Sequence, residues 1–366
     1  MQPDPLNESL PPTNSEDTES AGMSGFSRIS SIDDQLIALL AQRADLCRDL
    51  PLEKLNSIGS QLVQRTSSPS LEGLLATDLQ NDWLQHAHSL CMRVVESTRA
   101  PIVYLGPIYS YSYLAAVKHF GLGAELVPVS TIAAVFDELV RGQATFGVVP
   151  IENNTDGRVV DTLGMFARTP IDICGEVLLP IHHCLLGLGH RNDIEEIYSK
   201  PQALSQCRNW LAQHLPEARL VEVSSTALAA ARASQNAAIA AIASKEAGIH
   251  HGLQIIEEGI EDNAHNVTRF AVIGKRPSDP TGNDKTSLMF QLHHQPGALA
   301  NAMIAFQQNA INLTWIESFP LAGHPNEYLF FVELDGHRAT PAVANALAAL
   351  AKHTQRLNVL GSYPRG

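Results

Sequence analysis

The feature that most limits the fold of this chain is a regular alternation of short apolar runs and helix-like segments after residue 100. The runs 102–106 and 124–129 are strand-like, and each is followed by a segment whose apolar residues recur at helical spacing. The same alternation continues through 194–274. Short strands that alternate with helices indicate an α/β fold with a largely parallel sheet.

The flanking segments differ in composition and define further domains. Residues 1–25 combine Pro, Ser, Asn and acidic residues with no Lys, Arg or aromatic residue, which predicts a disordered acidic tail. Residues 26–99 carry helical spacing and no strand signal, so we expect an all-α domain there. The α/β core occupies 100–275, and 276–284 is a linker by composition. A βαββαβ order in 285–366 predicts a ferredoxin-like unit.

Composition excludes several classes of function. The chain has 366 residues, of which 45% are hydrophobic and 17% charged, and its net charge is −13. Such a chain is globular and a poor general binder of nucleic acid or anionic membranes. It has no apolar run long enough for a membrane span and no secretory pattern, so we expect a cytoplasmic protein. Five widely spaced cysteines without a CxxC pair, and the lack of nucleotide, zinc-protease and hydrolase motifs, lead us to expect no cofactor and no metal.

One polar cluster is a candidate for a ligand site. Glu152, Asn153 and Asn154 follow an apolar run that ends at Pro150. Ligands of parallel α/β sheets lie beyond the carboxyl ends of the strands, which favours a site here. Taken alone, the same residues fit slightly better a polar loop that leads into a helix.

Two further clusters allow both a functional and a structural interpretation. Thr268 and Arg269 open an apolar strand, where a guanidinium suits carboxylate recognition or a surface ion pair. Gly106, Pro107 and Ser110 lie where a strand passes into a helix. That geometry favours anions, but any strand–turn–helix connection shares it.

The joint order of these clusters resembles the prephenate dehydratase family. GPIYSYSYLAA, VVPIENNTDG, YSKPQALSQC and NVTRF occur in the family's order, followed by QPGALANAM and IESFP in the last unit. The likeness runs from about residue 101 to the C-terminus. It is closest to the bifunctional type, in which a chorismate mutase domain precedes the dehydratase and a C-terminal ACT domain. It implies a two-lobed core of the periplasmic-binding type, conversion of prephenate to phenylpyruvate in phenylalanine biosynthesis, and a degenerate mutase domain in 26–99.

The resemblance implies roles for individual residues. Thr268 matches the hydroxyl that assists the leaving group, and Arg269 would hold a carboxylate or the loop. Glu152 and Asn153 match the family's Glu-Asn pair and would line the same cleft. The residues expected to line the substrate site, among which the last is expected to pack rather than react, are Gly106, Pro107, Ser110, Asn154, Ser199, Gln206 and Phe270.

Departures from the family pattern bear on the cleft. The family has Gly followed by Thr or Ser where Tyr109 and Ser110 stand here, and a Tyr adopts Gly-only backbone angles at a cost. Either the loop is rebuilt or that angle is not needed. Asn154 replaces a frequent Ser or Thr, and Lys200 replaces a frequent His. Both keep hydrogen-bonding capacity, so we expect dehydratase activity to be retained.

The mutase-like segment matches its family at few positions. Only Arg43 and Lys54 fall where the family's first-helix cations lie, and Pro51 interrupts the helix that should carry Lys54. Family mutases surround their substrate with several cations. We therefore expect weak or absent mutase activity, with the segment kept for dimerisation.

The last unit resembles an ACT regulatory domain. The residues that match its two phenylalanine-binding motifs are Gly297, Ala298, Leu299, Glu317 and Ser318. Phe319 stands where the second motif has Arg. The resemblance implies phenylalanine as an allosteric inhibitor bound between paired domains, and hence a homodimer or homotetramer.

Two other functions fit parts of the pattern. An arogenate dehydratase would use the same motifs on a substrate with an amino group in place of the keto oxygen. A non-catalytic amino-acid-sensing protein would use the two-lobed core for binding alone. The intact Thr-Arg-Phe and Glu-Asn motifs favour an enzyme, with prephenate as partner and no nucleic acid or membrane.

Overall fold

The computed structural model describes residues 101–366 except Arg276 and 321–326, together with seven separate positions between 31 and 46. The chain divides into two units, 1–95 and 96–366. Within the described part of the chain, no helix combines the length and apolar character that a membrane span requires.

Some predictions fall outside the described residues. They are those for the acidic tail, for one linker residue and for most of the mutase-like segment, including Lys54. The seven described positions of that segment, Arg43 among them, are helical.

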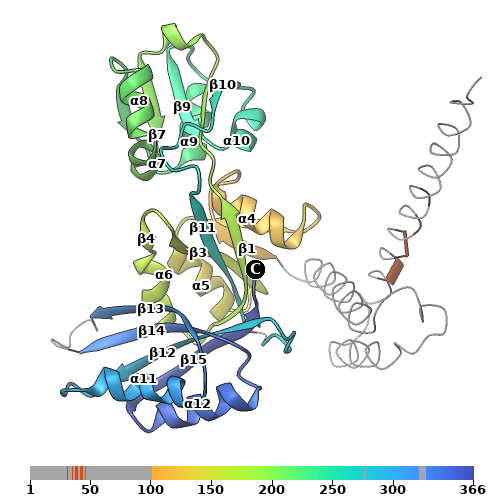
Figure 1. Cartoon of the computed structure of the whole chain (residues 1–366). Helices are drawn as coiled ribbons and strands as arrows, with labels where there is room; N and C mark the ends of the chain where they lie inside the picture. The colour runs from red at the N-terminus through yellow and green to blue at the C-terminus, as the bar shows by residue number, and fades with distance from the viewer. Residues whose placement is uncertain are drawn as a thin grey trace, which may run out of the picture. The chain divides into compact units, whose positions relative to one another are not determined.

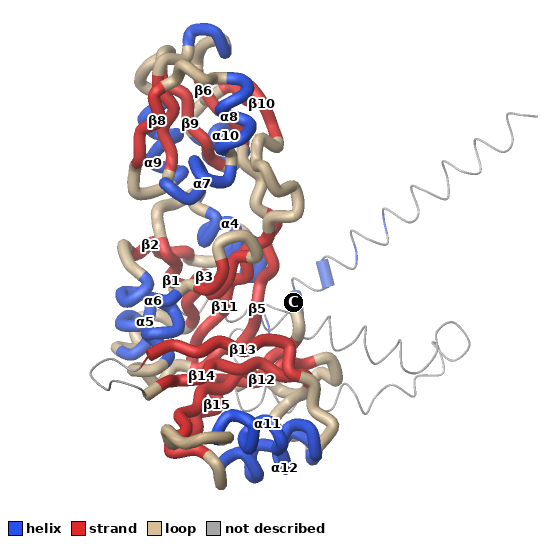
Figure 2. The backbone as a smooth tube through the Cα atoms, turned by 60° about the vertical axis from the view of Figure 1, so that its left-hand side comes forward, coloured by secondary structure: helices blue, strands red, loops and turns tan. Residues whose placement is uncertain are grey.

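The first lobe of the second unit (Figure 1) is a mixed sheet in the order β2-β1-β3-β11-β5, which can be followed in Figure 2, with the short β4 paired to β3. Its strands are β1 (Ile102–Leu105), β2 (Leu126–Val129), β3 (Phe146–Asn153), β4 (Gly157–Arg158), β5 (Asp172–Pro180) and β11 (Val267–Gly274). Its helices are α4 (Tyr111–Phe120), α5 (Ile132–Val140) and α6 (Val160–Phe166). Alternate strand residues face α5 and α6 on one side and α4 on the other, which makes a three-layer sandwich.

The second lobe is a five-stranded sheet in the order β10-β6-β9-β7-β8. Its strands are β6 (Cys184–Gly187), β7 (Glu196–Ser199), β8 (Arg219–Glu222), β9 (Ile239–Ala243) and β10 (Gln254–Glu258). Its helices are α7 (Pro201–Gln206), α8 (Arg208–His214), α9 (Thr226–Ala233) and α10 (Lys245–His250), with a 3₁₀ turn at Arg191–Asp193. The alanines of α9 and β9 allow this helix to lie close against the sheet.

The strand–helix alternation predicted a largely parallel sheet, and the family resemblance implied a two-lobed core; the structure has two sheets, one in each lobe. Each is parallel apart from a main strand that runs in reverse, β11 in the first lobe and β6 in the second. Both reversed strands are the first strand after the chain crosses between lobes, at 181–183 and at 259–266. The reversal follows from the two crossings, which no local pattern encodes. The strands β5, β6 and β10 were not among the predicted elements.

The C-terminal sheet has the predicted element order. It comprises β12 (Asp284–Leu292), α11 (Ala298–Gln308), β13 (Leu313–Pro320), β14 (Tyr328–Asp335), α12 (Pro341–Ala351) and β15 (Thr354–Pro364). The strands are antiparallel in the order β13-β14-β12-β15. Both helices cover one face of the sheet, as Figure 2 shows. The other face joins the core of the first lobe through Met289, Phe331, Leu360 and Tyr363.

Candidate active site

Strand β3 carries the Glu-Asn pair, and it is longer than the sequence predicts. We expected the strand to end at Pro150, but it continues to Asn153 and turns back through β4. Pro150 is tolerated because its neighbour β1 pairs with β3 only as far as Val148, so no ladder bond on that side is lost. Glu152 and Asn153 therefore belong to a strand rather than to a loop, whereas Asn154 lies in the turn that follows.

The register between β3 and β11 places the two motifs side by side. Thr268 lies opposite Asn153, and Arg269 lies opposite Glu152. Successive side chains of a strand point to opposite faces of the sheet. The motifs are thus divided into one pair on each face, and the two pairs have different surroundings.

Thr268 and Asn153 form a directed hydrogen-bonded pair. Asn153 Nδ2 donates to Thr268 Oγ1 over 2.8 Å and to Asn266 Oδ1 over 2.8 Å. Asn153 Oδ1 accepts from the backbone N–H groups of Thr155 and Asp156, at 2.9 and 3.0 Å, which fixes the amide orientation. Because Thr268 Oγ1 accepts a hydrogen bond, its own proton can be donated to a ligand.

Gln206 links this pair to the second lobe. Its Nε2 donates to Asp156 Oδ2 over 2.8 Å, and its Oε1 accepts from Asn266 Nδ2 over 3.1 Å. His183 Nε2 lies 2.8 Å from the same Oε1 and therefore acts as donor. Burial lowers the pKa of His183, so the ring is neutral and its Nδ1 faces the Tyr111 hydroxyl at 3.0 Å.

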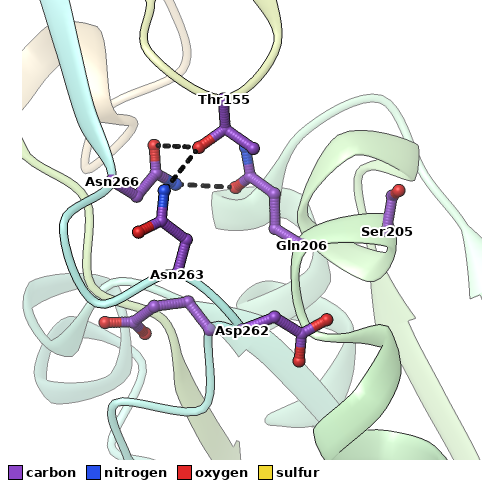
Figure 3. A pocket seen from close by; sticks show the side chains of 7 residues that line it. Thr155, Ser205, Gln206, Asp262, Asn263 and Asn266 are labelled. Atoms are coloured by element: carbon purple, nitrogen blue, oxygen red, sulfur yellow. Dashed lines mark hydrogen bonds between the residues drawn. The ribbon is translucent and has the colours of Figure 1, made fainter.

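A small pocket of about 150 Å³ lies beside this network. Figure 3 shows the side chains that line it and the hydrogen bonds among them. Asn266 belongs both to its wall and to the Asn153 contact, so the pocket adjoins the Thr268 pair. Burial alone would raise the pKa of Glu261, but hydrogen bonds from the His182 ring and the His183 backbone N–H lower it. The lining residues are Thr155, Ser205, Gln206, Glu261, Asp262, Asn263 and Asn266.

Arg269 and Glu152 lie on the opposite face and bind each other. Arg269 Nε donates to Glu152 Oε2 over 3.1 Å, and its Nη1 contacts Glu176 and Glu333 at 3.3 and 2.7 Å. Burial alone would lower the pKa of Arg269, but the carboxylates of Glu333 and Glu152 raise it. The guanidinium is thus charged and occupied by protein carboxylates, away from the face that carries Thr268.

Other residues predicted to bind substrate have structural contacts in this fold. Ser110 caps α4 by accepting from Tyr113 N, and Asn154 bonds the backbone of Val267 and His265. Ser199 is fully buried and donates to Ile242 O over 2.6 Å.

Three more of the predicted residues lie on β11 or in the loop after β1. Phe270 packs in the first-lobe core. A Cβ on Gly106 would meet Pro128 at 2.9 Å, which explains the glycine. Pro107, next to it, is exposed.

Tyr109 stands where the family has a glycine, and its backbone angle shows how the loop accommodates the change. Its backbone φ is 63°, so the left-handed angle is kept and a Tyr adopts it. The ring stacks on His250 of the second lobe with centroids 4.1 Å apart, and Ser244 Oγ lies 3.4 Å from Tyr109 O. These contacts join the lobes and offset the cost of the strained angle.

The residues predicted to bind phenylalanine lie in two places. Gly297 has φ 79° and precedes α11, while Leu299 on that helix is partly exposed. Side chains of β13 alternate, so Glu317 faces the first lobe and pairs with Arg158, whereas Ser318 is exposed. Phe319, where the family has Arg, packs against the first-lobe core.

Sequence reasoning assigned no role to several residues of this network. They are Tyr111, Asp156, His183 and Asn266. All four lie inside segments that resemble the family, but each is brought to the site by a different loop or helix. Among the described residues, no group of three or more His, Cys, Asp and Glu side chains could hold a metal ion.

Comparison with known proteins settles the family. The prephenate dehydratase family model matches residues 102–278. The bifunctional chorismate mutase/prephenate dehydratase of Aquifex aeolicus is 37% identical, over 92% of this chain and 96% of its own. The chain belongs to the prephenate dehydratase family. The family's architecture extends to solved structures: the Arthrobacter aurescens prephenate dehydratase, in complex with L-Phe, is 32% identical with a TM-score of 0.68, over 73% of this chain and 90% of its own. GqqA, described as a quorum quenching acylase, is 29% identical with a TM-score of 0.67, over 73% and 98%.

Proposed function

We propose that the protein converts prephenate to phenylpyruvate, with release of carbon dioxide and water. The observation that carries this proposal is the Thr268–Asn153 pair at the junction of the two lobes. As the bond from the ring to the carboxylate breaks, its electron pair enters the ring and expels the ring hydroxyl, which takes a proton and leaves as water. Aromatisation drives both steps, so the protein has to orient the dianion and assist the departing oxygen.

Thr268 can supply that assistance through its hydroxyl. Asn153 Nδ2 occupies an acceptor position on Thr268 Oγ1, which directs the hydroxyl proton toward a bound molecule. A Thr hydroxyl is a weak acid, so we assign it hydrogen bonding or proton relay to the leaving oxygen rather than complete transfer. Gln206 and the neutral His183 hold Asn266, and through it the amide of Asn153, in this arrangement.

The test of this proposal offers prephenate, arogenate and chorismate to the full chain in separate reactions. We expect phenylpyruvate from prephenate, slower or no turnover of arogenate, and little or no conversion of chorismate, because only Arg43 and Lys54 match the mutase cations. Preferred turnover of arogenate would assign the protein to the rival dehydratase. Absence of turnover of all three by folded protein would favour a binding protein instead.

We also propose that the C-terminal sheet is an ACT domain that binds phenylalanine. Its βαββαβ order supports this, as does the left-handed Gly297, where the lack of a Cβ lets a ligand approach the backbone. The Arthrobacter aurescens relative was solved with L-Phe. Binding between paired domains would make the protein a homodimer or homotetramer.

Isothermal titration calorimetry measures this binding directly. We expect heat of binding with phenylalanine at micromolar to millimolar concentration and a loss of dehydratase activity over the same range. Phe319 removes a cation from the second motif, so we expect weaker binding than a motif with Arg would give. Titration with alanine serves as the control, and no heat at millimolar phenylalanine would assign the domain a structural role alone.

A further inference from the structure

The C-terminal sheet contacts the first lobe at the two strands that carry the catalytic pair. Arg269 on β11 adjoins Thr268, and Arg158 on β4 lies opposite Glu152, one residue before Asn153. Each arginine contacts a carboxylate of the C-terminal sheet, Glu333 or Glu317. The strands of the active site are therefore held by ion pairs from the C-terminal sheet.

The Arg269 contact is buried and multiply bonded. Arg269 is 7% exposed and Glu333 is 1% exposed. Arg269 Nη1 donates to both oxygens of Glu333, at 2.7 and 2.9 Å, and its guanidinium carbon lies 4.8 Å from the ring centre of Trp315 on β13. Ser287 and Tyr363 donate to the same carboxylate, each at 3.2 Å. A buried charge with so many partners has a single arrangement unless the domain moves as a whole.

The Arg158 contact is half-exposed and belongs to the turn that follows Asn153. Gly157 lies opposite Asn153 in the β3–β4 pairing, so Arg158 follows directly after the turn that orients the Asn153 amide. Its partner Glu317 is one of the residues predicted to bind phenylalanine. A ligand that reorients Glu317 would therefore release one end of this turn.

We propose that Arg269 and Arg158 are positioning residues, through which the C-terminal sheet holds Thr268 and Asn153 in their productive arrangement and through which phenylalanine lowers activity. The regulatory half of this inference rests on the proposed function. Neither arginine takes part in the Thr268–Asn153 hydrogen bond itself. Their effect on turnover is carried by the backbone of β11 and β4, whose neighbouring residues form the Thr268–Asn153 hydrogen bond.

The test compares two variants with two matched controls. Glu333→Gln keeps the shape of the side chain and removes its charge, and Arg158→Gln cuts the half-exposed pair. The first control is Asp335→Asn: Asp335 lies on the same strand as Glu333 but contacts Arg365 and Asn312 rather than the first lobe. The second control is Arg141→Gln, which removes a surface arginine that pairs with Glu138 three residues earlier. All are assayed as the full chain.

We expect both variants to behave like the inhibited parent. Their kcat should fall by about fivefold or more with KM changed by less than about twofold, since misplacement of catalytic groups lowers turnover. Phenylalanine should bind at least as tightly as it binds the parent, because no ion pair has to be broken, and it should cause little further inhibition. Asp335→Asn and Arg141→Gln should keep the parent's kcat and inhibition.

Two results would overturn the proposal. One is that the two variants keep the parent's kcat and the parent's inhibition by phenylalanine. The other is that the controls lose as much kcat and inhibition as the variants do. If Glu333→Gln does not fold, Arg158→Gln alone tests the proposal, because loss of its half-exposed ion pair should not prevent folding. If the parent binds no phenylalanine, the proposed ligand is wrong, and kcat of the variants still decides whether the two arginines position the catalytic pair.

Discussion

Replacement of Thr268 by Ala is expected to lower kcat for phenylpyruvate formation by about a hundredfold or more, which is the usual contribution of a positioned proton donor. The substitution removes the hydroxyl that Asn153 Nδ2 orients and leaves the strand pairing intact. The interaction with the departing oxygen strengthens as that oxygen gains charge, so KM should change little. Steady-state assays with prephenate, with circular dichroism as a check on folding, measure both quantities.

Companion variants separate the hydroxyl from the shape of the side chain. Thr268→Ser keeps the hydroxyl and should retain most activity, whereas Thr268→Val keeps the shape and should resemble Thr268→Ala. Asn153→Asp should also reduce kcat strongly. The carboxylate would accept a hydrogen bond from the Thr268 hydroxyl, which would then no longer point to the substrate, and it would repel a dianionic substrate. Equal turnover of Thr268→Val and the parent would remove this hydroxyl from the mechanism.

Replacement of Gly361 by Ala is expected to destabilise the attachment of the C-terminal sheet by about 3 kcal/mol, from steric overlap and backbone strain together. Gly361 lies on β15, which packs against β5 of the first lobe, and its φ is 154°. A Cβ there would lie 2.1 Å from Ile173 O and 3.0 Å from Ile173 N. Because these are backbone atoms, a rotamer change cannot relieve the overlap, and the strand has to move.

Unfolding in urea, followed by circular dichroism, measures the change in stability. Gly123→Ala provides the matched control, since a Cβ at Gly123 meets no atom within 4 Å. It should leave the unfolding midpoint almost unchanged. If the C-terminal sheet holds the active site, Gly361→Ala should also lose phenylalanine sensitivity. If the unfolding midpoint of Gly361→Ala equals the parent's, Gly361 of β15 does not pack against the backbone of Ile173 on β5.

Local patterns were enough to predict most helices and many strands of the core. Helix α5 begins after Thr131, whose hydroxyl accepts from Ala134 N, and α4 ends at Gly121, both as the turn and cap residues indicate. The strands β5, β6 and β10 could not be found in this way. They flank the two crossings between lobes, where the direction of each strand depends on a partner more than 60 residues away in the chain.

The motifs showed which residues matter, but not which face each one occupies. Asn153 and Thr268 were expected to share a cleft with Glu152 and Arg269. The β3–β11 register instead puts the second pair on the opposite face, with Glu333. Alternation along a strand is visible in a sequence only when one face is apolar, and here both faces carry polar groups.

The amino-acid sequence by itself determined the family, the helices and strands of the core, and the polar segments from which the site is built, because these depend on neighbouring residues and on ordered motifs. Tertiary structure alone decided that Thr268 meets Asn153, that His183 of the crossing and Gln206 of the second lobe reach the site, and that Arg269 binds a carboxylate of the C-terminal sheet. These contacts join residues tens to more than a hundred positions apart, and their geometry is set by strand register and domain packing, which no local pattern specifies.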